Sequence, residues 1–367
     1  MRILIAAGGT GGHLYPAIAL GKELKKRSCV TLFVIRSNSL ASKALNLEGL
    51  DFVEASSAPV SIKKPLSILT GAFSNLKGVF EGLKAVKTFK PDCAVGFGAY
   101  VSVPSLVACA LKGVPIVLHE QNVDPGWANR FCAMFSKKVA VSFPQTEKDF
   151  PGKSVLVGNP VREELLNSQP AEARKSLGLK EGLQTVLVFG GSAGAKSVNQ
   201  AVVESLAGLS DLKEKIQFLH LTGRGEEKEK LEQKYAASRF HAVVLHYSDR
   251  MGDCYSSASF AVCRSGATTA AELIATKTPA VLVPYPYATG DHQKSNAYFL
   301  EGLGCAAVVL ESENFGRELA EKMRSMASQD GAVKKMRENF SKFPVSLRES
   351  AGKLADAVMD AGKAGRA

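Results

Sequence analysis

The 367-residue sequence has no long apolar run, no secretory signal and no cysteine pair. None of its apolar runs reaches the roughly 18 residues that a bilayer-spanning helix needs. The N-terminus, MRILIAAGG, starts on a strand-like run rather than on a charged segment and a cleavable apolar core. The seven cysteines are scattered without a CxxC spacing, which favours reduced, buried thiols over disulfides or zinc ligands. These absences predict a globular cytoplasmic protein. Its length of 367 residues is sufficient for two domains.

Aromatic residues are also sparse, and acidic residues are outnumbered. Phe, Trp and Tyr make up 7% of the chain and show no stacking pattern of the kind that binds nucleic acid. Lys and Arg number 46 against 35 Asp and Glu, and residues 1–160 hold 19 basic and 10 acidic residues. This asymmetry indicates that the first half meets an anionic partner, such as a membrane surface, a nucleic acid or phosphates. The low aromatic content argues against nucleic acid.

Apolar strand-like runs alternate with helical stretches, and the pattern occurs twice. One series opens with ILIAAGGTGGH at 3–13 and the other with VLVFGGSAGA at 186–195, each a strand that runs into a glycine-rich turn. Buried apolar strands separated by helices predict parallel sheets covered on both faces. We therefore predict an α/β protein of two Rossmann-like, doubly wound domains that face a substrate cleft. The predicted divisions are residues 1–160, residues 161–340, and a helical tail at 341–367 that packs back on the first domain.

The two glycine-rich turns do not match the common nucleotide fingerprints. The first lacks the G-x-G-x-x-G spacing, and Arg36 and Ser37 stand where a dinucleotide-binding domain has its acidic residue. The second is close to a Walker A loop, but Ala195 replaces the glycine before Lys196. Each is then either a tight turn without a ligand or an anion cradle built from N–H groups at a helix start. Two such turns at one cleft favour the cradles.

Polar residues cluster after several predicted strands. Glu272 lies one to two turns into a helix, where it could accept both hydroxyls of a ribose or simply offset the helix N-terminus. Gln293 and Asn296 suit either a sugar or a helix start. Residues 119–122, with the sequence His-Glu-Gln-Asn, end a buried strand. His13, at the first turn, is either a general base or a structural histidine.

Seven segments carry a more specific signal because of their order. Between residues 8 and 297 the chain reads GGTGGHLYPAIAL, FGAYVSVP, HEQNVDPGWANR, VGNPVR, FGGSAGAKSVN, CRSGATTAAEL and VPYPYATGDHQKSNA. Together they resemble the GT-B glycosyltransferases, and among these the enzymes that add N-acetylglucosamine (GlcNAc) to undecaprenyl-pyrophosphoryl-MurNAc-pentapeptide (lipid I). The resemblance implies an inverting transfer of GlcNAc from UDP-GlcNAc to the C4 hydroxyl of MurNAc, which makes lipid II for peptidoglycan synthesis. It also implies a peripheral location on the cytoplasmic face of the bacterial plasma membrane.

The resemblance also implies roles for individual residues. His13 would be the general base, with Glu120 as the alternative. The acceptor side would include Gly9, His13 and Tyr100. The UDP-GlcNAc site would include Thr10, Gly11, Gly12, Asn122, Arg162, Ser192, Ser248, Arg264, Ala267, Glu272 and Gln293. Within that site, Glu272 would hold the ribose, Ser192 the diphosphate, Gln293 and Asn122 the sugar, and the backbone near Ser248 the uracil. One departure is Ala193, which stands where the family commonly has Gln.

No D-x-D pair is present to hold a metal, so we expect that no cofactor is required. Helix N-termini, with Arg264 or Arg162, would stabilise the leaving diphosphate instead. Two other classes remain open. One is another UDP-sugar GT-B enzyme, either a glycolipid glycosyltransferase or a UDP-GlcNAc epimerase. The other is a non-enzymatic binding module for a nucleotide sugar or a nucleic acid.

Residues 61–90 predict a basic amphipathic helix. Six lysines stand against Glu81 alone. One apolar stripe at helical spacing consists of Leu66, Leu69, Phe73, Leu76, Phe80 and Leu83, and a narrower one of Ile68, Val79 and Val86. At least one stripe packs on the sheet. Because a basic amphipathic segment also suits an anionic inner leaflet, we predict that this helix docks the first domain on the membrane. The lysines are Lys63, Lys64, Lys77, Lys84, Lys87 and Lys90.

Overall fold

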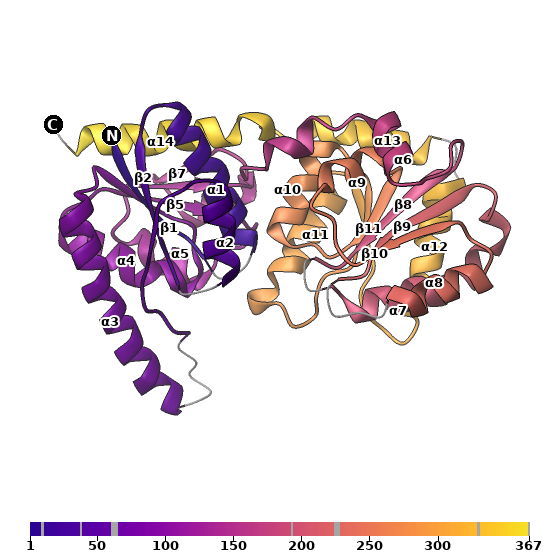
Figure 1. The fold of residues 1–367 in the computed structure, drawn as a ribbon, viewed down its shortest axis with the longest axis horizontal. Coiled ribbons are helices and arrows are strands. Elements are labelled where there is room, and N and C mark those ends of the chain that lie inside the picture. Colours follow the sequence, from indigo (N-terminus) through magenta and orange to yellow (C-terminus); the bar gives the residue numbers. More distant parts are fainter. Residues whose placement is uncertain are drawn as a thin grey trace. The chain divides into compact units, whose positions relative to one another are not determined.

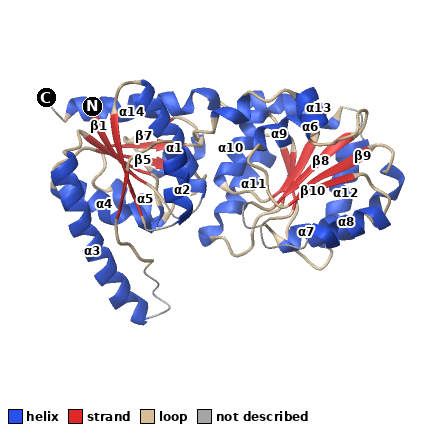
Figure 2. Cartoon of the chain, viewed as in Figure 1, coloured by secondary structure: helices blue, strands red, loops and turns tan. Residues whose placement is uncertain are grey.

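The computed structural model describes residues 1–8, 11–36, 39–59, 65–191, 194–223, 228–328 and 331–365. The chain divides into two compact units. The first unit consists of Met1–Arg162 and Val345–Ala367, and the second of Glu163–Pro344. Figure 1 traces the chain through both units, and Figure 2 marks the helices and strands of each.

The first unit is built on a seven-stranded sheet in the order β3-β2-β1-β4-β5-β6-β7, in which every neighbouring pair is parallel. The strands are β1 (Arg2–Ala6), β2 (Val30–Ile35), β3 (Phe52–Glu54), β4 (Cys93–Gly96), β5 (Ile116–Glu120), β6 (Lys138–Val141) and β7 (Ser154–Leu156). The helices are α1 (Gly11–Lys26), α2 (Ser39–Leu47), α3 (Pro65–Phe89), α4 (Ala99–Leu111), α5 (Trp127–Ala133) and α14 (Ser350–Ala364). The strand order reverses between β1 and β4, which is where such sheets bind ligands.

The second unit is built on a six-stranded parallel sheet in the order β10-β9-β8-β11-β12-β13. The strands are β8 (Gln184–Phe189), β9 (Ile216–Leu221), β10 (Ala242–Leu245), β11 (Phe260–Cys263), β12 (Ala280–Leu282) and β13 (Ala306–Val308). The helices are α6 (Pro170–Ser176), α7 (Lys196–Ser205), α8 (Lys228–Ala237), α9 (Met251–Ser257), α10 (Ala267–Thr276), α11 (His292–Gly302), α12 (Phe315–Ser328) and α13 (Ala332–Asn339). Its order reverses between β8 and β11. The predicted pair of doubly wound parallel-sheet domains is confirmed.

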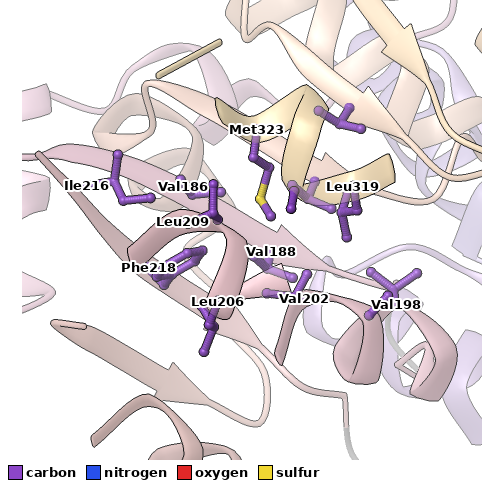
Figure 3. Close-up of a cluster of buried hydrophobic side chains, with 14 of the residues drawn as sticks. Val186, Val188, Val198, Val202, Leu206, Leu209, Ile216, Phe218, Leu319 and Met323 are labelled. Carbon is purple, nitrogen blue, oxygen red and sulfur yellow. The ribbon is translucent and has the colours of Figure 1, made fainter. Parts of the chain in front are cut away.

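Each sheet is buried because helices cover it and contribute to its core. In the second unit, Val186 and Phe218 of the sheet pack with Val202 of α7 and Met323 of α12 in one apolar cluster (Figure 3). Strands covered on both faces need apolar side chains on both, which is why the strand runs show no alternation with polar residues.

The C-terminal helix α14 belongs to the first unit although it follows the second in sequence. Its residues Leu354 and Val358 lie in the same apolar cluster as the β1 and β4 side chains. At its solvent side, Arg27, which follows the last residue of α1, forms an ion pair with Asp356 at 2.5 Å and donates a hydrogen bond to the carbonyl oxygen of Gly352. Helix α14 thus packs against the sheet of the first unit.

Helix α3 exposes three residues of its wide apolar stripe. Phe73, Leu76 and Phe80 are 74%, 56% and 64% exposed. The opposite side packs on α4 through glycines, since a Cβ on Gly82 would lie 2.9 Å from the Cβ of Ala108. Figure 1 shows α3 extending away from the sheet of its unit. No helix in the described ranges is long and apolar enough to cross a bilayer.

Two buried histidines are expected to make the fold sensitive to acid. Burial lowers the pKa of His119 to about 4 and that of His220 to about 3. The unfolded chain protonates these rings near pH 6.5, so below that pH the unfolded state binds more protons than the folded state. The free energy of unfolding should therefore fall as the pH drops from about 6.5 toward 4, by roughly 3 kcal/mol for each histidine.

Urea unfolding followed by circular dichroism near neutral pH and near pH 5 measures this loss. His220→Gln should reduce the dependence of stability on pH, because one of the two titrating rings is gone. His241→Gln, at a partly exposed site, is the matched control and should keep the wild-type dependence. If the His220→Gln protein lost stability with acid as steeply as the wild type, the explanation would be wrong.

Candidate active site

The candidate residues divide between the two units. The first unit holds Gly11, Gly12, His13, Tyr100, Glu120, Asn122 and Arg162, and the second holds Ser248, Arg264, Ala267, Glu272 and Gln293. Gly9, Thr10, Ser192 and Ala193 lie outside the described residues. Most of the described candidates follow the carboxyl ends of strands, where parallel sheets bind ligands.

His13 is held at the switch point of the first sheet. It is the third residue of α1, and its Nδ1 lies 2.8 Å from the carbonyl oxygen of Phe97, after β4. The same Nδ1 lies 3.2 Å from Oε1 of Gln121, after β5. A carbonyl oxygen can only accept, so Nδ1 carries a proton, and in the neutral ring the lone pair is then on Nε2. A neutral imidazole in this tautomer can take a proton from a hydroxyl at Nε2.

Glu120, the alternative base, is engaged on both carboxylate oxygens. It ends β5 and is 1% exposed. Oε1 accepts hydrogen bonds from the backbone N–H and the side-chain amide of Asn122, at 2.9 and 3.3 Å. Oε2 accepts from the backbone N–H of Gly126 at 3.1 Å and the amide of Asn129 at 2.8 Å. These four bonds occupy the lone pairs of the carboxylate and order the loop after β5, so the geometry favours His13 as the base.

Tyr100 lies beside a cation that the sequence did not single out for this site. It is the second residue of α4. The guanidinium of Arg36, just after β2, donates a hydrogen bond to the Tyr100 hydroxyl at 2.7 Å and lies 5.9 Å from the ring centroid. Arg36 is exposed, so it adds positive charge to the carboxyl edge of the sheet. In the sequence, Arg36 directly follows a predicted strand, and this position could have identified it as a candidate site residue.

Arg162 also lies near the first turn of α1. Its guanidinium stacks 4.9 Å from the ring centroid of Tyr15, two residues after His13. Gly11 and Gly12 are the first two residues of the same helix. A cation and a helix start in one place suit an anionic group, and the contact of each with UDP-GlcNAc stays a prediction.

The second glycine-rich turn, between β8 and α7, admits no side chain at two of its glycines. A Cβ on Gly190 would lie 2.3 Å from the backbone nitrogen of Ala195. Gly194 has a φ of +83°, and a Cβ there would lie 2.4 Å from the carbonyl oxygen of Thr222. These contacts require glycine at both positions, and a diphosphate cradle is likewise built from backbone rather than from side chains. Binding of a diphosphate there stays a prediction.

Arg264 lies next to the start of α7, the helix that follows this turn. It is buried after β11, where its Nη1 pairs with Oε1 of Glu311 at 2.6 Å. Its Nη2 donates to the hydroxyl of Ser197, the second residue of α7, at 2.9 Å, and that hydroxyl donates to Glu311 at 2.9 Å. Glu311 balances the guanidinium charge. The arrangement supports a role in holding the start of α7, and direct contact of Arg264 with the diphosphate stays a prediction.

Glu272 is oriented by a tyrosine that the sequence did not reveal. Helix α10 begins at Ala267 after Gly266, and Glu272 lies buried one to two turns in. The hydroxyl of Tyr255, on α9, donates to Oε2 of Glu272 at 2.9 Å. This hydrogen bond orients the carboxylate in the absence of a ligand, and its contact with two ribose hydroxyls stays a prediction.

The two side-chain amides after β12, those of Asn296 and Gln293, differ in burial and in their hydrogen-bond partners. Asn296 is fully buried and donates to the carbonyl oxygen of Ser265, so it ties α11 to the turn after β11. Gln293 is half-buried, and its Oε1 accepts the backbone N–H of Tyr285 at 3.0 Å. Asn296 therefore has a structural role, and the contact of Gln293 with a sugar stays a prediction. Ser248, after β10, accepts the backbone N–H two residues further on at the start of α9.

All seven cysteines are buried and form no disulfide bond, as the sequence predicted. Among the described residues, no group of three or more His, Cys, Asp and Glu side chains is arranged to hold a metal ion.

Comparison with known proteins gives the family. The glycosyltransferase family 28 N-terminal domain matches residues 3–141, and the family 28 C-terminal domain matches residues 185–350. A relative from Myxococcus xanthus (strain DK1622) is named UDP-N-acetylglucosamine–N-acetylmuramyl-(pentapeptide) pyrophosphoryl-undecaprenol N-acetylglucosamine transferase. It is 37% identical, over 98% of this chain and 93% of its own. A relative of the same name from Halothermothrix orenii is 35% identical, over 94% of this chain and 95% of its own.

A solved structure agrees with these relatives. The crystal structure of Acinetobacter baumannii MurG has a TM-score of 0.79 and 25% identity, and covers 98% of this chain and 99% of that one. Full-length similarity to these enzymes accounts for the order of the seven motifs and for the two parallel sheets. The chain belongs to the MurG family of GT-B glycosyltransferases, within glycosyltransferase family 28.

Proposed function

We propose that this chain transfers GlcNAc from UDP-GlcNAc to the C4 hydroxyl of MurNAc in lipid I, which forms lipid II. The relatives named above act on this pair of substrates. The observation that carries the proposal is His13, which presents a bare Nε2 at the carboxyl edge of the first sheet. An acceptor hydroxyl needs such a base, whereas a binding module does not.

The proposed step is a single displacement. The C4 oxygen of the acceptor attacks the anomeric carbon of GlcNAc while His13 Nε2 takes the hydroxyl proton. The bond between the anomeric carbon and the UDP oxygen breaks on the opposite face, and UDP leaves with the electron pair. Attack opposite the leaving group inverts the configuration and gives a β-1,4 linkage. Backbone N–H groups of the glycine turns and helix starts supply the positive potential that the leaving diphosphate requires.

The alternative UDP-sugar enzymes can be distinguished from this proposal by the acceptor that each requires. A UDP-GlcNAc epimerase would alter UDP-GlcNAc alone, whereas this chain should leave it intact until lipid I is added. Proton NMR of UDP-GlcNAc with the protein, before and after addition of a short-chain lipid I analogue, separates the two. A glycolipid glycosyltransferase would instead glycosylate a diacylglycerol supplied in the same assay. Conversion of UDP-GlcNAc in the absence of any acceptor would overturn the proposal.

We expect turnover to be independent of divalent metal ions. The sequence contains no D-x-D pair, and the proposed stabilisation of UDP relies on backbone N–H groups and arginines. Initial rates with excess EDTA should equal those with added magnesium or manganese ions. A rate that falls to background with EDTA and returns with either ion would contradict this expectation.

The chain is also proposed to dock on an anionic membrane, at the cytoplasmic face of the plasma membrane where lipid I is used. The support is the exposed face of α3, where a shallow hollow is lined by Phe73, Leu76, Lys77, Phe80, Glu81 and Lys84. Aromatic and aliphatic side chains of this size cost free energy in water and enter the acyl boundary readily. Lysines on the same helix add attraction to acidic headgroups.

Reversing the charge of Lys77, Lys84 and Lys87 to Glu should release the protein from vesicles that contain phosphatidylglycerol. Each lysine near an anionic surface contributes about 1 kcal/mol, so the triple reversal should lower the partition coefficient by at least about a hundredfold. Vesicle sedimentation measures this. The matched control replaces three exposed lysines of the second unit, Lys175, Lys215 and Lys322, with Glu. Equal loss of binding in both variants would show that net charge, and not α3, is responsible.

A further inference from the structure

Gln121 and His119 form a hydrogen-bonded chain behind His13 that the proposed step does not use. Both side chains are buried. The amide nitrogen of Gln121 lies 3.0 Å from the carbonyl oxygen of Phe97 and 3.0 Å from Nδ1 of His119. Its Oε1 is the atom that faces Nδ1 of His13. Gln121 therefore joins the two histidines through opposite ends of one amide.

The direction of this chain is set at its far end. Nε2 of His119 lies 3.1 Å from the carbonyl oxygen of Gly158, which can only accept, so Nε2 carries the proton. Nδ1 of His119 is then an acceptor for the Gln121 amide. The opposite amide orientation would place Oε1 against the carbonyl oxygens of Phe97 and His119, which the amide nitrogen now meets at 3.0 and 3.1 Å. Every donor consequently points from His13 toward Gly158.

We propose that Gln121, held in place by His119, is a positioning residue for His13. Its Oε1, together with the carbonyl oxygen of Phe97, keeps the imidazole proton on Nδ1 and leaves Nε2 bare. The opposite tautomer would present a donor to the acceptor hydroxyl where the proposed step needs a base. The inference rests on the proposed function only for the identity of His13 as that base. The tautomer itself is a property of the free protein.

The first test reads the ring tautomers without any substrate. Two-bond proton–nitrogen NMR spectra of protein labelled with nitrogen-15 histidine separate protonated from bare ring nitrogens, and loss of signals in His13→Gln assigns the ring. We expect Nδ1 of His13 to be protonated and Nε2 to be bare near neutral pH. A proton on Nε2 would overturn the proposal, whether or not the protein makes lipid II.

The second test separates positioning from packing with two variants. Gln121→Leu removes both ends of the amide, whereas Gln121→Glu keeps an acceptor for His13 but cannot donate to Phe97 or His119. We expect the leucine variant to raise the share of the Nε2–H tautomer, because only the Phe97 carbonyl oxygen is left to accept from Nδ1, and to lose about tenfold in kcat, with KM for UDP-GlcNAc unchanged. The glutamate variant should keep the Nδ1–H tautomer in larger proportion than the leucine variant, because one oxygen still faces Nδ1 of His13. Its second oxygen meets the carbonyl oxygens of Phe97 and His119, so its kcat is compared only with that of the wild type.

The reverse order would overturn the proposal. If the amide mattered only for its donated hydrogen bonds, the glutamate variant would hold the Nδ1–H tautomer no better than the leucine variant. A wild-type protein with the expected tautomer but no lipid II would refute the proposed function and leave the positioning intact. Either variant that fails to fold leaves the wild-type spectrum as the deciding measurement.

Discussion

Replacing His13 with alanine should lower kcat by about 10²- to 10⁴-fold, the usual contribution of a positioned general base. UDP-GlcNAc should bind as it does to the wild type, because His13 is assigned to the acceptor side and not to the UDP-GlcNAc site. Stopped assays of lipid II formation give kcat, and calorimetry gives the affinity for UDP-GlcNAc. We therefore expect a large fall in kcat and an unchanged affinity for UDP-GlcNAc.

Glu120→Gln is the informative comparison for His13→Ala. Because all four hydrogen bonds to the Glu120 carboxylate come from N–H groups, the glutamine amide would face donors and disorder the loop after β5. We expect that variant to lose stability as well as turnover, whereas His13→Ala should melt close to the wild type. A folded His13→Ala protein with wild-type kcat would exclude His13 as the base and return attention to Glu120.

Replacing Glu272 with alanine should weaken UDP-GlcNAc binding by more than about a hundredfold. Hydrogen bonds to a charged group contribute about 1.5–3 kcal/mol each, and a ribose would donate two of them to this carboxylate. The same substitution leaves the Tyr255 hydroxyl without its acceptor, so Tyr255→Phe measures how much of the loss comes from orientation alone. Glu313→Ala, at an exposed site in the same unit, is the control for removal of a negative charge.

A double-mutant cycle with 2′-deoxy-UDP-GlcNAc tests the assignment to the ribose directly. The wild type should bind the deoxy sugar nucleotide more weakly than UDP-GlcNAc, whereas Glu272→Ala should bind the two alike. If the variant still discriminated between them by the wild-type factor, Glu272 would not contact the ribose.

The fold was predictable because its signals are local. Apolar runs of strand length, separated by helical stretches and followed by glycines, recur in both halves and are visible without knowledge of contacts. Helix α3 shows the limit of that approach. Its two apolar stripes both follow helical spacing, and periodicity alone could not say which one packs. The deciding feature is Gly82, which permits the close approach to α4.

The partners of the site residues were not predictable, because they come from distant parts of the chain. His13 stands at a glycine turn and was found, but Phe97 and Gln121, whose oxygens its Nδ1 meets, are 84 and 108 residues away. Arg264 was expected at the diphosphate, and only the folded sheet reveals that Glu311 balances its charge. Tyr255 gives no signal in the sequence because buried tyrosines on short helices are ordinary core residues.

The most direct test of the central claim is transfer of radiolabelled GlcNAc from UDP-GlcNAc to a short-chain lipid I analogue, with EDTA present. We predict a lipid-linked disaccharide with a β-1,4 linkage, and free UDP in equal amount. Absence of labelled product, with UDP-GlcNAc still bound tightly, would contradict the proposed acceptor and leave only the fold and the donor.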